Sequence, residues 1–124
     1  VIIMNGDVCF SDTILRKITD AQNGNYILID SSKPSLDPVF NSTTVKNWTG
    51  EYAGIYRLTK TNALKLKKQV EECVLTEKYS YYHESALLKL LKNGLQIEKI
   101  DIAGNKWAEI DTKEDFEKAK DIFC

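Results

Sequence analysis

The sequence predicts an α/β fold in which a mixed sheet is flanked by helices. Short apolar runs that end at turn residues, as strands do, alternate along the chain with longer segments whose apolar residues recur at helical spacing. The first run, the helix after it and the second run also form a β-α-β unit. A short helical crossover of this kind favours strands that run in parallel.

The first part of the chain is predicted to hold two strands and one helix. Residues 1–4 are apolar and are followed by Asn-Gly, so we expect a buried strand that ends there. Ser11 can cap a helix that runs to about residue 22. Residues 26–30 then form a second strand. The predicted core face of the helix consists of Ile14, Leu15 and Ile18.

A long loop, a strand and a helix come next. Residues 33–48 contain both prolines and many Ser, Thr and Asn residues, which indicates a surface loop. Residues 52–58 are predicted to form a strand, and Thr59 or Thr61 can cap the helix that follows. The predicted core residues of that helix are Ala63, Leu64, Leu66 and Val70.

Two further helices are expected, with a hairpin between them. One helix is predicted over 82–92, ended by Asn93-Gly94, and a strand over 95–102 follows it. Residues 107–110 are expected to pair back on that strand after a turn, and the last helix covers 112–123. The predicted core residues of these two helices are Ala86, Leu87, Leu90, Leu91, Phe116, Ala119 and either Ile122 or Phe123.

The composition is that of one folded domain over residues 1–124. Hydrophobic residues make up 43% and charged residues 28%, and the net charge of -1 leaves no basic excess that would bind nucleic acid. Cys9, Cys73 and Cys124 lack the spacing of a disulfide framework or a zinc site, so we expect a reduced, cytoplasmic setting. No apolar run approaches the roughly 18 residues of a membrane span. We expect neither nucleic acid nor membrane as a partner, and the oligomeric state stays open.

Acidic side chains near both ends of the chain form a candidate metal site. Asp7 follows the first strand, and the carboxyl edge of an α/β sheet is where ligands bind. Side chains alternate along a strand, so Trp107, Glu109 and Asp111 are expected on one face. Carboxylates that converge repel one another unless a cation lies between them, and such oxygen ligands suit Mg²⁺ together with the phosphates of a substrate. The pattern therefore predicts phosphoryl or nucleotidyl chemistry.

A structural role is the alternative for each of these residues taken singly. An aspartate after a strand is commonly a turn former or a helix cap. Thr112 can cap the last helix in a capping-box pattern with Asp115. Trp107 can either wall the site or fill the core. The joint occurrence of the carboxylates favours a metal site.

An aromatic and acidic segment lies at the start of the predicted helix over 82–92. Tyr82 is the last of several tyrosines and is followed by His83 and Glu84. Aromatic faces attract quaternary ammonium groups and a carboxylate adds charge pairing, so this segment could bind a cationic head group of the choline type. Alternatively, the tyrosines pack in the core and Glu84 interacts favourably with the helix dipole.

Three segments resemble nucleotidyltransferases of the nucleotide-diphospho-sugar transferase fold. The closest branch is the one with phosphocholine cytidylyltransferases and the cytidylyltransferases of phosphonate biosynthesis. The segments are residues 5–8 followed by Phe10, residues 50–56, and residues 107–112 followed by Glu114-Asp115. The resemblance covers the whole chain and implies a Rossmann-like mixed sheet flanked by helices.

The resemblance also implies roles for individual residues. Asp7 and Asp111 would be catalytic, and they would bind Mg²⁺ together with Glu109. The residues implied in substrate binding are Glu51, Tyr52, Gly54, Tyr82, Glu84 and Trp107.

One part of the family pattern is absent from this sequence. The family begins with a strand and a Gly-rich loop that bears an Arg and later a Pro-Lys, and this segment holds the base and triphosphate of the nucleotide. The chain instead opens on Val1, inside an apolar run. We therefore expect it to be the C-terminal, acceptor- and metal-binding half of a longer protein.

The resemblance implies Mg²⁺-dependent nucleotidyl transfer. An NTP, with CTP as the expected one, would react with a phosphate or phosphonate acceptor such as phosphocholine or 2-aminoethylphosphonate, and pyrophosphate would be released. Two alternatives stay open: a sugar-1-phosphate nucleotidyltransferase, and a non-catalytic binding module derived from this fold. The sequence does not decide the nucleotide base or the acceptor.

Overall fold

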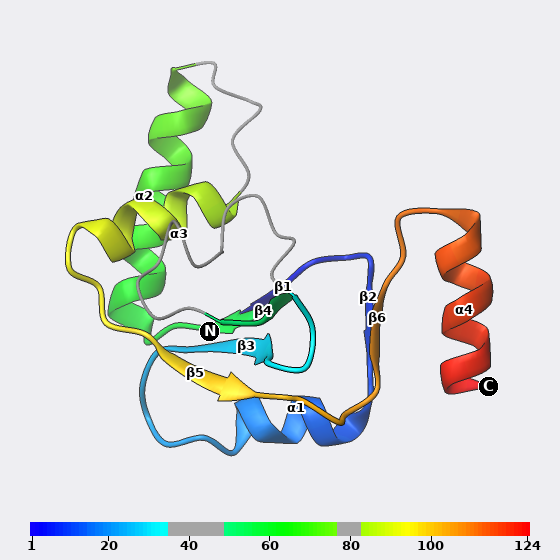
Figure 1. Cartoon of the computed structure of the whole chain (residues 1–124). Helices are drawn as coiled ribbons and strands as arrows, with labels where there is room; N and C mark the ends of the chain where they lie inside the picture. The colour runs from blue at the N-terminus through cyan, green and yellow to red at the C-terminus, as the bar shows by residue number, and fades with distance from the viewer. Residues whose placement is uncertain (35–48, 77–82) are drawn as a thin grey trace.

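The computed structural model describes residues 1–34, 49–76 and 83–124. The helices of this part of the chain are α1 (Asp12–Thr19), α2 (Lys60–Leu75), α3 (His83–Lys92) and α4 (Lys113–Phe123). The main sheet has α1 on one face and α2 and α3 on the other (Figure 1). The predicted fold class, a mixed sheet flanked by helices, is confirmed.

The main sheet has four strands in the order β1-β4-β3-β5. β1 and β3 are both antiparallel to β4, while β5 is parallel to β3. β1 and β3 therefore run in the same direction, as the β-α-β unit predicts, but β4 lies between them. The strands are β1 (Ile2–Met4), β3 (Tyr26–Asp30), β4 (Glu51–Arg57) and β5 (Glu98–Asp101).

The prediction that the first strand is buried is wrong. β1 is an edge strand whose neighbour among the described strands is β4. Ile2 and Ile3 are half-buried, and Met4 is 48% exposed. An edge strand is covered from one side only, so an apolar run does not by itself indicate full burial.

The predicted hairpin between residues 95–102 and 107–110 is also wrong. β6 (Trp107–Glu109) pairs antiparallel with β2 (Val8–Phe10), a strand that the sequence analysis did not identify. The two form a separate two-stranded sheet. β5 is instead paired with β3. Three-residue strands show too little periodicity to be recognised, and their partners are set by the tertiary fold.

Three helices start directly after the predicted capping residues, although α1 ends at Thr19 and not near residue 22. The Thr59 side chain accepts a hydrogen bond from the N–H of Asn62 at the start of α2. Thr112 and Asp115 form a reciprocal capping box at the start of α4. Ser11 is the N-cap residue of α1, although its side chain makes no capping hydrogen bond.

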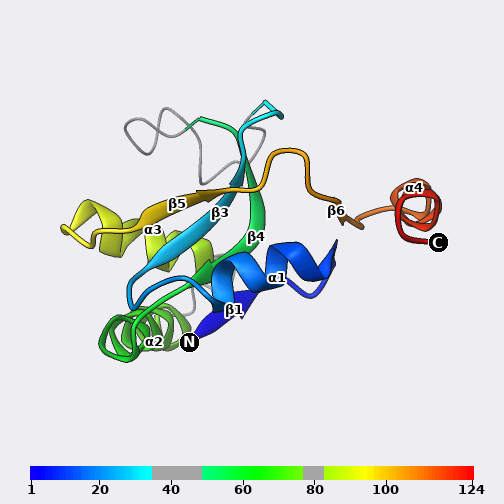
Figure 2. The same cartoon turned by 90° about the horizontal axis from the view of Figure 1, so that it is seen from below.

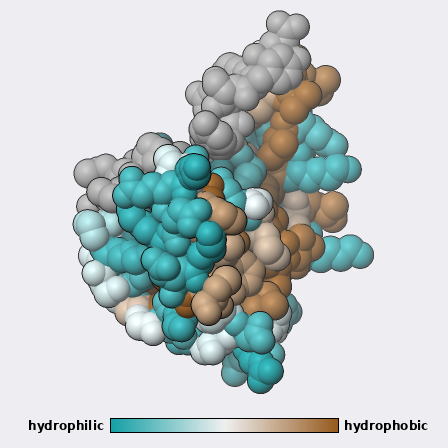
Figure 3. Space-filling model, turned by 90° about the vertical axis from the view of Figure 1, so that its right-hand side faces the viewer, coloured by the Kyte–Doolittle hydropathy of each residue, from teal (hydrophilic) through white to brown (hydrophobic). Residues whose placement is uncertain are grey.

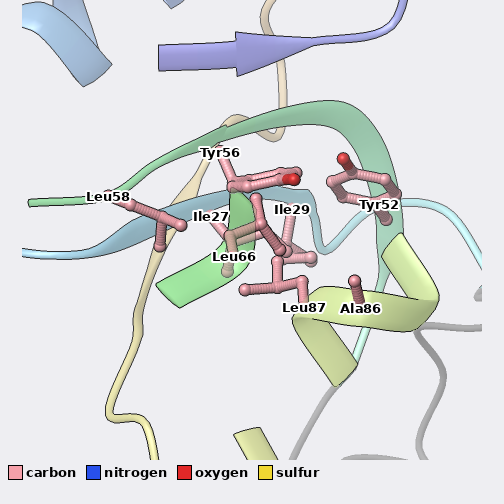
Figure 4. Packing of buried hydrophobic residues seen from close by; sticks show 8 residues of the cluster. All are labelled: Ile27, Ile29, Tyr52, Tyr56, Leu58, Leu66, Ala86 and Leu87. Carbon is pink, nitrogen blue, oxygen red and sulfur yellow. The ribbon is translucent and has the colours of Figure 1, made fainter. Parts of the chain in front are cut away.

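Two apolar clusters fill the space between the sheet and its helices. One cluster lies between the sheet and α2 and α3 (Figure 4), and the other lies against α1. Leu15 and Leu64, both predicted in the core, are 36% and 58% exposed, so these two predictions are wrong. The first cluster contains Ile27, Ile29, Tyr52, Tyr56, Leu58, Leu66, Ala86 and Leu87, and the second contains Ile14, Ile18, Leu28, Ala53, Ile55, Ile102 and Trp107.

α4 stands apart from the layers of the main sheet, as both ribbon views show (Figures 1 and 2). Its main contacts are with β6. Ala119 is buried as predicted, but Phe116 is 50% and Phe123 39% exposed, so the prediction that Phe116 is a core residue is wrong. On this side of the molecule apolar surface lies next to hydrophilic surface (Figure 3). Among the described residues, every helix falls short of the length and apolar character of a membrane span.

Candidate active site

Three acidic side chains from the two ends of the chain meet at one place. One carboxylate oxygen each from Asp7, Glu109 and Asp111 can be chosen so that all three lie within 4.8 Å of one another. All three residues are exposed. The structure thus brings together the residues that the sequence analysis proposed as metal ligands, although Asp7 is more than 100 positions from the other two in the sequence.

The pairing of β2 with β6 explains this convergence. Val8 lies opposite Glu109 in the ladder, and the N–H of Ile110 donates a hydrogen bond to the carbonyl oxygen of Asp7 at 2.8 Å. Asp7, in the turn between β1 and β2, is therefore held beside the end of β6. The sequence predicted that these carboxylates meet, but not that a short second strand brings them together.

This arrangement is suited to a hard divalent cation. Three carboxylates supply oxygen ligands, and their exposure leaves room for water and for phosphate oxygens to complete the coordination that Mg²⁺ prefers. Exposed carboxylates can also lie together in water without an ion, because solvent screens their repulsion. The geometry is therefore compatible with a metal site.

The predicted substrate residues of β4 lie in different surroundings. Glu51 is half-buried at the start of the strand, opposite Asp30 in the ladder. Tyr52 is 4% exposed and belongs to the core cluster against α2 and α3 (Figure 4). Gly54 has a φ of +72°, and a Cβ there would lie 2.8 Å from the Val8 side chain. The missing side chain of Gly54 thus allows β4 to approach the segment that carries Asp7.

The aromatic and acidic segment that includes His83 and Glu84 contributes a buried carboxylate. Tyr82 lies outside the described residues, while Glu84, in the first turn of α3, is 7% exposed. One oxygen of Glu84 lies 3.2 Å from Nε2 of His83. Burial, together with the nearby Glu84 carboxylate, raises the pKa of the Tyr56 hydroxyl well above its ordinary value. Tyr56 therefore stays a neutral phenol at physiological pH.

Trp107 fills the core instead of lining the carboxylate cluster. It is 7% exposed and packs in the cluster against α1, whereas Glu109 and Asp111 are exposed, so the expected shared face does not give these residues a shared environment. Its indole N–H donates to Asp30 at 2.8 Å. The Nζ of Lys33 lies 3.9 Å from the centroid of the Trp107 ring.

Two polar groups in this region were not identified from the sequence. Asn5 and Tyr56 both contact His83, at 3.0 Å and 2.9 Å respectively. Asn5 looks like an ordinary turn residue in the sequence, and Tyr56 like an ordinary strand residue. No local pattern indicates such a contact, because the residues involved come from three separate segments.

Comparisons with known proteins show the fold. Neither family profiles nor curated protein sequences match this chain. A similar solved structure is that of a protein assigned as a glucose-1-phosphate thymidylyltransferase from Bacillus anthracis, in complex with sucrose. It superposes with a TM-score of 0.61 at 17% sequence identity, over 97% of this chain and 52% of the other. The chain thus spans about half the length of that protein, and shares with this part of it a mixed α/β fold.

Proposed function

We propose that this chain provides the metal- and acceptor-binding part of a Mg²⁺-dependent nucleotidyltransferase. The observation that carries the proposal is the convergence of Asp7, Glu109 and Asp111 in one exposed cluster. The similarity of the fold to a sugar nucleotidyltransferase supports it independently. In this proposal Asp7 and Asp111 are the catalytic carboxylates, and Glu109 completes the metal site.

The proposed reaction needs no nucleophilic side chain. An oxygen of the acceptor's phosphate or phosphonate forms a bond to the α-phosphorus of the NTP, and the bond from that phosphorus to the oxygen bridging to the β-phosphate breaks. Pyrophosphate leaves with the electron pair. The contribution of the protein is therefore to position the two anions in line, which is where enzymes of phosphoryl transfer gain most of their rate. Bound Mg²⁺ would supply the charge neutralisation that lets two anions approach.

Within this class we favour CTP as the nucleotide and an amine-bearing acceptor such as phosphocholine or 2-aminoethylphosphonate. The support is Glu84, a carboxylate that lies 3.2 Å from His83 and acts electrostatically on the Tyr56 hydroxyl, since a carboxylate near aromatic side chains suits a cationic head group. Glu51, Tyr52, Gly54 and Tyr82 remain proposed substrate-binding residues on the family resemblance, whereas the packing of Trp107 in the cluster against α1 favours its structural role. A sugar 1-phosphate is the second candidate, favoured by the name of the solved relative.

Binding of Mn²⁺, a paramagnetic substitute for Mg²⁺, tests the metal site directly. Water-proton relaxation or electron paramagnetic resonance measures the Kd, first with the chain alone and then with CTP present. Asp7→Asn and Asp111→Asn should each weaken Mn²⁺ binding by about 10-fold or more, because each removes one anionic ligand. Asp121→Asn, which removes an exposed carboxylate in α4, is the matched control and should bind as the unmodified chain does.

Two outcomes would overturn the proposal. Asp7→Asn and Asp111→Asn could bind Mn²⁺ as tightly as the Asp121→Asn control, which would leave the cluster without a metal. Alternatively, Mn²⁺ could bind normally while, in a protein that also supplies the nucleotide-binding segment, no pairing of CTP, UTP, GTP or dTTP with phosphocholine, 2-aminoethylphosphonate or glucose 1-phosphate releases pyrophosphate. That second result would favour a non-catalytic binding module.

A further inference from the structure

We propose that His83 is a positioning residue that holds the turn carrying Asp7 in register with Glu109 and Asp111. The inference rests on the proposed function, because it assigns His83 a role in the metal site. His83 does not belong to the carboxylate cluster. It would act through Asn5, which lies two residues before Asp7.

The ring of His83 has polar partners at both nitrogens. Nε2 lies 3.0 Å from Oδ1 of Asn5 and 3.2 Å from Oε1 of Glu84. Both partners are oxygen acceptors, so Nε2 carries a proton and donates. Nδ1 lies 2.9 Å from the Tyr56 hydroxyl and, in the neutral ring, accepts a hydrogen bond from it. The partners thus select one tautomer and fix the orientation of the ring.

Tyr56 holds the His83 ring from a rigid part of the core. Its side chain is fully buried in β4, in the cluster that packs against α2 and α3 (Figure 4). The raised pKa of its hydroxyl keeps the proton that the hydrogen bond to His83 requires. His83 is also the first residue of α3, so its backbone moves with that helix. The imidazole is therefore anchored to two elements of the core.

Asn5 transmits this anchoring to the turn. Its backbone N–H donates to the carbonyl oxygen of Gly54 at 2.9 Å, while its side chain accepts from His83. The other end of the turn is tied by the hydrogen bond from Ile110 to Asp7. The turn is thus fastened on one side to β4 and α3, and on the other to the end of β6. Loss of the Asn5 contact should let the Asp7 carboxylate move relative to the other two.

His83→Ala and His83→Gln separate positioning from folding. Partners outside the metal coordination shell typically contribute about 10-fold or more to metal affinity, so His83→Ala should weaken Mn²⁺ binding by about 10-fold. The amide of Gln can still donate to Asn5, so His83→Gln should recover most of that loss. Lys89→Ala, at an exposed position of α3, is the matched control and should change nothing. Thermal unfolding of each variant shows whether it is folded.

Amide hydrogen exchange tests the positioning without any metal. In His83→Ala the N–H groups of Asn5 and Ile110 should exchange faster, while the N–H groups of the central strand β3 keep their rates. Unchanged exchange at Asn5, or equal Mn²⁺ affinity of His83→Ala and the unmodified chain, would overturn the inference. If the unmodified chain bound no Mn²⁺, the proposed function would fail, and the exchange at Asn5 would still decide whether His83 holds the turn.

Discussion

At the scale of single residues, Asp30 shows how this fold retains a buried charge. Its side chain at the end of β3 accepts hydrogen bonds from the backbone and hydroxyl of Ser32 and from the indole of Trp107, and Lys33 lies 3.9 Å away. Burial acts to raise the pKa of Asp30, but the hydrogen bonds from Ser32 and Trp107 outweigh it and hold the pKa below its ordinary value. The carboxylate is therefore ionised in the folded state at neutral pH.

Asp30→Asn should lower the free energy of unfolding at neutral pH. It should also reduce the loss of that free energy on acidification. The folded-state pKa of Asp30 lies below the unfolded value of about 3.9, so its contribution is present above that pH and is lost as the pH falls through the folded-state pKa. The Asn amide would turn a donor toward Ser32 or Trp107, at a cost of about 2 kcal/mol. Urea unfolding at neutral and at acidic pH measures both effects.

Asp121→Asn serves as the control for this experiment, because Asp121 is exposed. Its unfolding free energy should follow that of the unmodified chain across the whole pH range. An Asp30→Asn variant that loses as much stability on acidification as this control would contradict the role given to Asp30.

At the scale of elements, Gly54 shapes β4. The register between β3 and β4 shifts between Ile27 and Ile29 of β3, which marks a bulge in β4. Gly54 lies in that part of β4 with a φ of +72°. The bulge brings the Gly54 carbonyl to the N–H of Asn5. One irregularity in a strand thus helps to place the turn that leads to Asp7.

Gly54→Ala should be more destabilising than Gly104→Ala. Both glycines have positive φ values, +72° and +79°, so each substitution introduces backbone strain of about 1 kcal/mol. A Cβ at Gly104 would meet no atom within 4 Å, whereas one at Gly54 would lie 2.8 Å from the Val8 side chain and 3.2 Å from Asn5. We expect an additional loss of about 1–3 kcal/mol from this overpacking. Chemical unfolding compares the two, and equal losses would contradict the close approach.

Local signals account for most of the elements that the sequence analysis identified. The strand over 26–30 and the helix stop at Asn93-Gly94 are observed as predicted, because apolar periodicity and turn chemistry act over a few residues. The capping box of Thr112 and Asp115 is likewise confirmed. β2 was missed since three residues carry no such signal.

At the scale of the whole molecule, α4 buries fewer apolar side chains than the central strands β3 and β4 of the main sheet do. Among its residues Ala119 is buried, while Phe116 and Phe123 remain partly exposed. Few buried apolar contacts mean that a helix can open without the rest of the protein. The position of α4 beyond β6 is consistent with this expectation (Figure 2).

Hydrogen exchange should therefore show α4 opening locally. Its amide groups are expected to exchange through an opening of lower free energy than those of β3 and β4, whose side chains are almost fully buried. α2 is the control helix, because Leu66 packs it into the core. Exchange of α4 at the same free energy as the central strands would show that it unfolds only with the whole protein.

The sequence predicted which residues form the candidate site, but not how the fold brings them together. Asp7, Glu109 and Asp111 could be proposed from the sequence since acidic residues at strand ends are visible there. Their convergence depends on the pairing of β2 with β6. In the sequence, His83 is part of an aromatic segment. Only its contacts with Asn5 and Tyr56 in the structure suggest a link to the proposed metal site.

The sequence by itself determined the fold class, the helices with their caps and the carboxylates of the candidate site, because these depend on periodicity and chemistry within a few residues. The tertiary structure alone decided the strand order, the pairing of β6, the burial of Trp107 and the exposure of Phe116. The physical reason is that strand pairing and burial join residues far apart in the chain. The residues next to a given position in the sequence do not indicate which distant residue will be its partner.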